Sequence, residues 1–134
     1  MKILFLSHYT KLYGANRSLI DLILQLREKG VEAIVVMPSD GDLARILAEE
    51  KIEYIIDPFS FWVNTLDRTG NIVERLKKRY KFLKFGIKIT QNNRIVVEKL
   101  FHRFENQNID LIYSNSSVIN IGFNLAKRLC VPHI

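Results

Sequence analysis

The stretch that decides the fold is KILFLSHYTKLYGANRSLIDLILQLREKG, residues 2–30. After Lys2, residues 3–6 are an unbroken apolar run, which is typical of a strand buried on both faces of a parallel sheet. Polar residues at 7–10 end that run. Apolar residues then recur every three or four positions until Gly30, and glycine commonly follows the end of a helix. The stretch therefore predicts a buried strand, a loop and a helix.

The rest of the chain repeats this alternation of strand and helix. Strands alternating with helices form right-handed βαβ units, in which helices cover both faces of a parallel sheet. We therefore expect one α/β domain over residues 1–134, a Rossmann-like three-layer sandwich with a parallel sheet of about five strands. Further strands are predicted at residues 31–37, 52–56 and 110–113, and a fifth strand is predicted to begin at residue 131. Asp42 is predicted to cap a short second helix. The remaining helices are predicted at residues 72–89, 93–105 and 118–129.

Composition narrows the class of protein. The 134 residues carry a net charge of +6, and 48% of them are hydrophobic, as in an ordinary globular domain. Cys130 is the only cysteine, so no internal disulfide can form, and the three histidines lack the spacing of metal ligands. The apolar run near the N-terminus is too short for a signal peptide or a membrane span. We therefore expect a cytoplasmic protein without a metal or other cofactor, truncated within its last strand.

The loop after the first strand is the first candidate for ligand binding. Gly14 and Ala15 lie just before a helix N-terminus, where backbone N–H groups and the helix dipole can meet a phosphate. The alternative is that Gly14 only permits a tight turn and that Asn16 or Ser18 only caps the helix. The dinucleotide fingerprint G-x-G-x-x-G and the P-loop are both absent. Nicotinamide and P-loop chemistry are therefore disfavoured.

Three segments of the chain, in the right order, resemble the family-4 glycosyltransferases of the GT-B architecture. They are KILFL followed by YGANRSL at residues 13–19, DLIYSNS at 110–116 and LAKRLCVPHI at 125–134. The resemblance implies the N-terminal, acceptor-side half of a two-domain enzyme that transfers a sugar from a nucleotide-sugar with retention and without a metal. The donor-binding C-terminal half, with its Glu-x7-Glu motif, has no counterpart here. By this resemblance, the present chain alone is not expected to catalyse.

The resemblance also assigns expected roles to individual residues. Gly14, Ala15 and Asn16 would form the loop that contacts the donor phosphates, and Arg17 and Asn16 would lie at the cleft edge or cap the helix. The family commonly has a glycine where this chain has Tyr13, and many members have a histidine where this chain has Asn115.

Acceptor-side candidates follow the strands. His8 ends the first strand, where a neutral imidazole can hydrogen-bond an acceptor hydroxyl or simply cap the strand. Ser114 and Asn115 end the fourth strand. Trp62 belongs to an aromatic cluster after the third strand that stacks on an acceptor sugar or lipid, or folds into the core. The expected partners are thus a nucleotide-sugar and a saccharide or lipid-linked acceptor.

A basic segment follows the third strand. Residues 75–103 hold ten Lys and Arg and one acid, Glu98, for a local net charge of +9, with apolar residues at helical spacing between them. A basic amphipathic helix with aromatic residues fits an anionic membrane surface on the cytoplasmic side. The alternatives are a solvated helix whose apolar stripe packs on the sheet, and nucleic-acid binding, which no RNP, KH or helix-turn-helix pattern supports. The membrane-surface candidates are Lys77, Lys78, Arg79, Lys81 and Lys84.

A rival interpretation comes from another class of protein. The same fold and loop fit a non-catalytic Rossmann-like domain that binds a nucleotide or another anion. The donor sugar, the acceptor and the oligomeric state are not readable from these residues.

Overall fold

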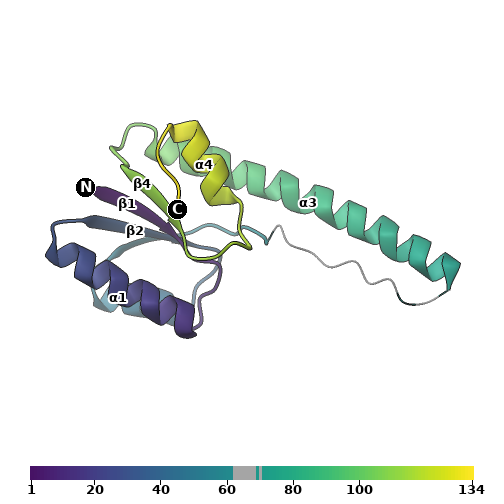
Figure 1. Ribbon diagram of the computed structural model, residues 1–134, viewed down its shortest axis with the longest axis horizontal. Coiled ribbons are helices and arrows are strands. Elements are labelled where there is room, and N and C mark those ends of the chain that lie inside the picture. The colour runs from purple at the N-terminus through teal and green to yellow at the C-terminus, as the bar shows by residue number, and fades with distance from the viewer. Residues whose placement is uncertain (62–68, 70) are drawn as a thin grey trace.

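A computed structural model describes residues 1–61, 69 and 71–134. The strands form one four-stranded parallel sheet in the order β3-β2-β1-β4 (Figure 1). The predicted Rossmann-like α/β fold is confirmed, with four strands in place of about five. In chain order the elements are β1 (Lys2–Leu6), α1 (Gly14–Glu28), β2 (Glu32–Met37), α2 (Asp42–Glu49), β3 (Glu53–Ile56), α3 (Ile72–Phe104), β4 (Leu111–Ser114) and α4 (Ile121–Leu129).

The strand order reverses at β1. The chain runs outward from β1 through β2 to β3 and then returns, through α3, to place β4 on the other side of β1. In open parallel sheets ligands bind outside the carboxyl ends of the strands, near such a switch point. The fold therefore directs attention to the loops after β1 and β4.

Alternate side chains of each strand divide the core into two layers. On one face, Phe5 and Val35 pack with buried residues of α1 and α2. On the other face, Leu4, Val36 and Ile112 pack with buried residues of α3 and α4. Figure 1 shows α1 on one side of the sheet and the pair α3 and α4 on the other. The near-continuous burial of β1 explains why its sequence has no polar alternation.

The predicted fifth strand is reduced to a single bridge beside β4. Ile112 and His133 pair in parallel. The N–H of Ile112 donates to Pro132 O at 3.0 Å, and the N–H of Ile134 donates to Ile112 O at 3.0 Å. The C-terminal residues thus follow the predicted direction but make too few pairings to form a strand.

The two helices expected at residues 72–89 and 93–105 are one helix, α3, of 33 residues. An Asn71–Glu74 capping box begins it. Its buried residues all belong to the C-terminal half, from Ile89 to Phe104, and the N-terminal half extends away from the sheet (Figure 1). The interpretation that the whole apolar stripe packs on the sheet is therefore wrong for that N-terminal half.

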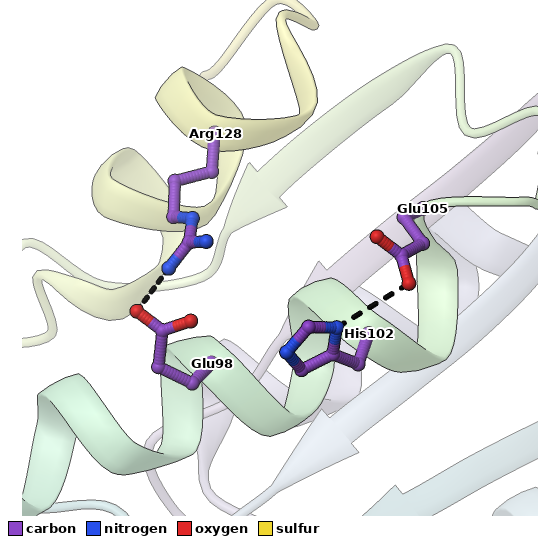
Figure 2. A network of polar contacts seen from close by, with 4 residues as sticks. All are labelled: Glu98, His102, Glu105 and Arg128. Atoms are coloured by element: carbon purple, nitrogen blue, oxygen red, sulfur yellow. Dashed lines mark hydrogen bonds and ion pairs between the residues drawn. The ribbon is translucent and has the colours of Figure 1, made fainter.

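Side-chain contacts join the C-terminal half of α3 to α4. Glu98 on α3 pairs with Arg128 on α4 (Figure 2). The Arg128 guanidinium also lies 4.3 Å from the centroid of the Phe101 ring on α3. A second pair, His102 with Glu105, is local to the end of α3. Arg128 therefore joins α4 to α3 through both Glu98 and Phe101.

Three helices begin elsewhere than predicted. Helix α1 starts at Gly14, before Asn16, and its N-cap residue Tyr13 makes no side-chain capping bond. Helix α2 has Gly41 as its N-cap, so Asp42 is its first residue and stabilises the helix through the dipole instead of capping it. Helix α4 starts at Ile121 rather than at residue 118.

Candidate functional site

A pocket of about 410 Å³ opens where β1, β2 and β3 end. Residues that follow these three strands form one side of it, and two residues of α3 form the other. Its position at the carboxyl ends of the strands is the one at which parallel sheets bind ligands. The lining residues are His8, Pro38, Phe59, Ser60, Phe61, Phe85 and Ile89.

Among the described residues, His8 is the one titratable side chain that lines this pocket. Its ring lies 4.4 Å from the Tyr9 ring and 5.9 Å from the Phe61 ring. Its Nδ1 is buried and has no hydrogen-bond partner among the described residues. Burial lowers the pKa of His8, so the imidazole is neutral at pH 7 and offers one donor and one acceptor nitrogen.

Asn93 holds the loop that forms the aromatic wall of the pocket. This buried residue of α3 accepts a hydrogen bond from the N–H of Ser60 at 2.9 Å and donates to Ser60 O at 2.8 Å. It also donates to Oδ1 of Asn120 at 3.1 Å, before α4. The sequence analysis missed Asn93. Its signal was an amide one turn after Ile89 and three residues before Val96, on the buried stripe of the helix.

Asn16 organises the loop between β1 and α1. Its side chain is buried, with Oδ1 2.8 Å from the Ser7 hydroxyl, and its Nδ2 donates to Tyr9 O and Lys11 O at 2.8 Å each. Both amide hydrogens are therefore used within the loop. The expected placement of Asn16 as a cap or at the cleft edge is wrong, because its side chain points into the protein.

Gly14 and Ala15 remain available at the N-terminus of α1. Both are exposed, and a Cβ added at Gly14 would meet nothing within 4 Å. Their N–H groups belong to the first turn of the helix, which has no intrahelical acceptors for them. Tyr13 is exposed and its ring packs edge-on against the Tyr9 ring, with centroids 6.5 Å apart.

The end of β4 adjoins this same turn of α1. Asn115 Nδ2 donates to Ala15 O at 3.2 Å and lies 3.4 Å from Asn16 Oδ1. The N–H of Asn115 also donates to Leu6 O at 2.9 Å. Two segments a hundred residues apart in sequence are thus brought together at the switch point between β1 and β4.

The other predicted residues lie elsewhere. Ser114 turns toward the C-terminal residues, with its Oγ 2.9 Å from Nε2 of His133, and burial lowers the pKa of that imidazole. Arg17 is exposed on α1. Trp62 lies outside the described residues.

The basic candidates lie on the projecting half of α3. Lys77, Arg79, Lys81 and Lys84 are exposed, whereas Lys78 is partly buried and its Nζ donates to the carbonyl and the hydroxyl of Thr69. Within the described ranges, no group of three or more His, Cys, Asp or Glu could hold a metal ion.

No protein-family model and no curated protein matches the sequence. Solved structures match it across nearly its whole length. Anabaena HepE, crystallised with UDP and glucose, is 22% identical with a TM-score of 0.60 over 99% of this chain and 28% of HepE. A Rickettsia africae glycosyltransferase is 18% identical with a TM-score of 0.57 over 98% of this chain and 28% of its own length. Acinetobacter baumannii MurG is 17% identical with a TM-score of 0.56 over 98% of this chain and 33% of MurG.

The chain has the fold of one half of a GT-B glycosyltransferase. It spans about a third or less of the length of these three proteins. The same fold also occurs in the C-terminal domain of the Pyrococcus furiosus PF1911 hydrogenase, with a TM-score of 0.57 and 16% identity over 99% of this chain and 88% of that domain. At these identities the likeness describes the fold, and chemistry has to be argued from the site.

Proposed function

We propose that this chain is the acceptor-side half of a retaining glycosyltransferase that moves a sugar from a nucleotide-sugar to a saccharide or lipid-linked acceptor. The observation that carries the proposal is the pocket at the strand ends, lined by His8 and by aromatic side chains, in a glycosyltransferase-like fold. HepE has been crystallised with UDP and with UDP-glucose, which supports a nucleotide-sugar as the donor. The free thiol Cys130 suits a reducing, cytoplasmic location.

The donor diphosphate would be met by the first turn of α1. Gly14 and Ala15 offer backbone N–H groups there, and the positive end of the helix dipole favours an anion. Asn16 and Asn115 fix this turn from two sides, so its N–H groups are held in place before a ligand arrives. A second α/β half would hold the rest of the nucleotide.

The acceptor would occupy the pocket beside His8. Phe59 and Phe61 give it an apolar wall on which a sugar ring or a lipid can pack. The neutral imidazole of His8 would orient an acceptor hydroxyl by a hydrogen bond.

Substitution of Gly14 tests the donor part of this proposal. The variant Gly14→Ala places a methyl group in open space, so the fold should be unaffected, but the methyl would stand between a diphosphate and the backbone. We expect UDP affinity of the complete gene product, measured by titration calorimetry, to fall roughly tenfold. The matched control is Gly86→Ala on α3, also in open space and remote from α1. Equal UDP affinity of native protein and Gly14→Ala would contradict the proposed role of this turn.

A second candidate function is a non-catalytic nucleotide- or anion-binding domain. It is favoured by the pocket lining in the described part of the chain, which is mostly apolar and aromatic and holds no acidic side chain. Incubation of the gene product with radiolabelled nucleotide-sugars and a membrane extract separates the two. Label incorporated into lipid or saccharide supports transfer, whereas UDP binding without incorporation supports the binding domain.

A further inference from the structure

The N-terminal half of α3, residues 72–88, carries an apolar face with no covering partner in the described part of the chain. We call this half-helix the α3 arm. Five apolar side chains make up this face and are between 56 and 75% exposed, far more than a helix normally leaves open to water. They are Ile72, Leu76, Tyr80, Leu83 and Ile87.

These side chains form one face because they recur every three or four residues. The same periodicity places Lys84, Lys77 and, further round the helix, Lys81 on one side of the face and Arg79 on the other. The arm as a whole holds seven Lys and Arg and one acid, Glu74, for a net charge of +6. An apolar stripe bordered by basic residues is the pattern of a helix that lies in a membrane interface.

We propose that the α3 arm docks its apolar face onto an anionic lipid surface. Charge selects this partner over a second copy of the chain, since two arms of the same sign would repel each other. It also selects lipid over nucleic acid, because phosphates would engage the lysines and leave the apolar face in water. In a lipid interface the apolar side chains enter the acyl boundary while the lysine stems extend their charges to the headgroups.

The arm can dock without closing the pocket. Phe85 and Ile89 line the pocket, and helical periodicity directs them to the side of α3 roughly opposite Leu83 and Ile87. Docking would thus hold the pocket within about one helix diameter, ~10 Å, of the lipid surface and leave its mouth open. No helix within the described residues is long and apolar enough to cross a membrane, so the contact would be peripheral.

Co-sedimentation with vesicles tests the docking directly and does not depend on any enzymatic activity. The native protein should sediment with vesicles of phosphatidylcholine mixed with phosphatidylglycerol, much less with phosphatidylcholine alone, and less as salt is raised. Equal binding to both vesicle types, or to neither, would overturn the proposal.

Two variants separate the charge of the arm from its apolar face. The triple variant Lys77→Ser, Lys81→Ser and Lys84→Ser should lower partitioning about a hundredfold, because each basic group near the surface contributes roughly fivefold. The double variant Leu76→Ser and Leu83→Ser keeps the charge and should also lose most binding. All five side chains are exposed, so the fold should tolerate these substitutions.

Matched controls use exposed residues outside the arm. The control for charge is Lys29→Ser, Arg103→Ser and Lys127→Ser, and the control for apolarity is Ile95→Ser and Phe123→Ser. Both should sediment like the native protein. If the charge control loses as much binding as the arm variant, the attraction belongs to the net charge and the proposal fails. Native binding by Leu76→Ser and Leu83→Ser, together with salt-sensitive binding to duplex DNA, would instead identify a nucleic-acid surface and overturn it.

Discussion

Asn93 and Ser60, 33 residues apart in sequence, form a pair of hydrogen bonds in which the Asn93 amide accepts from the Ser60 N–H and donates to the Ser60 carbonyl. The side chain thereby pairs with the loop backbone as a neighbouring strand would. The loop it holds carries Phe59 and Phe61, which form the wall of the pocket. One buried amide on α3 therefore shapes the candidate acceptor site.

We expect Asn93→Ala to lower the free energy of unfolding by about 1–3 kcal/mol, because it leaves partly buried backbone groups of Ser60 without partners. Urea denaturation measures the change. The neighbouring Asn92→Ala is the control, since it removes one exposed hydrogen bond to Pro58 O and should cost less than about 1 kcal/mol. Equal losses in the two variants would mean that the Asn93 hydrogen bonds contribute no more to the free energy of unfolding than an exposed hydrogen bond does.

The pairing of Glu98 with Arg128 supports a smaller prediction. Arg128→Ala removes an ion pair between half-exposed side chains together with the stacking of the guanidinium on Phe101 (Figure 2). We expect a loss of about 1–2 kcal/mol in the free energy of unfolding. The variant Glu98→Gln keeps the stacking and should lose less than Arg128→Ala. His102→Ala serves as a control on the same helix, because its contact with Glu105 is exposed and local and should contribute about 0.5 kcal/mol or less.

The sequence predicted the central part of the fold because its signals there are local. The apolar run of β1, the helical spacing of α1 and the glycine that follows α1 each depend on neighbours within a few residues. The position of the site at the strand ends followed from the parallel topology, and the exposure of Gly14 and Ala15 agrees with it.

The predictions that failed involve asparagines whose side chains bind outside their own helix. The sequence predicts two helices, at residues 72–89 and 93–105, but the structure has one helix, in which Asn93 bonds to residues 33 and 27 positions away that a local pattern cannot register. Asn16 suggested a cap because Asn is common there, yet its amide binds the loop that precedes the helix. In both cases a buried asparagine replaces an expected surface role.

Two imidazoles, of the partly buried His8 and of His133 near the C-terminus, make stability depend on pH. Burial lowers the folded-state pKa of His8 and of His133 below the ordinary value of about 6.5 that they have in the unfolded chain. As pH falls below that value, the unfolded state binds more protons than the folded state, so the free energy of unfolding decreases. Above that value both states hold neutral imidazoles, and the free energy of unfolding no longer changes through them.

The contribution of His8 to this pH dependence can be measured by substitution. Urea denaturation of the native protein and of His8→Gln, at several pH values between about 7.5 and 5, should give a shallower loss for the variant. Gln91→Asn is the control, because it changes an exposed side chain that carries no titratable group. A slope identical in native protein and His8→Gln would show that the pocket leaves His8 free to protonate.

The contact between α4 and the end of β4 leaves no room for a side chain at Gly122. A Cβ there would lie 2.2 Å from Ser114 Oγ, 2.7 Å from Leu6 Cδ1 and 3.0 Å from His133 Nε2. Gly122→Ala should therefore lower the free energy of unfolding by about 1–3 kcal/mol, as overpacking of a core does, although alanine is the better helix former. Gly86→Ala, in open space on α3, should instead stabilise by about 0.5–1 kcal/mol.

A double variant identifies the source of the clash at Gly122. Ser114→Ala removes the nearest atom, so Gly122→Ala combined with Ser114→Ala should be more stable than the sum of the two single changes predicts. Additive losses would place the strain at Leu6 in the sheet instead. Because the Ser114 hydroxyl also lies 2.9 Å from Nε2 of His133, the single variant Ser114→Ala measures how much this contact contributes to the free energy of unfolding.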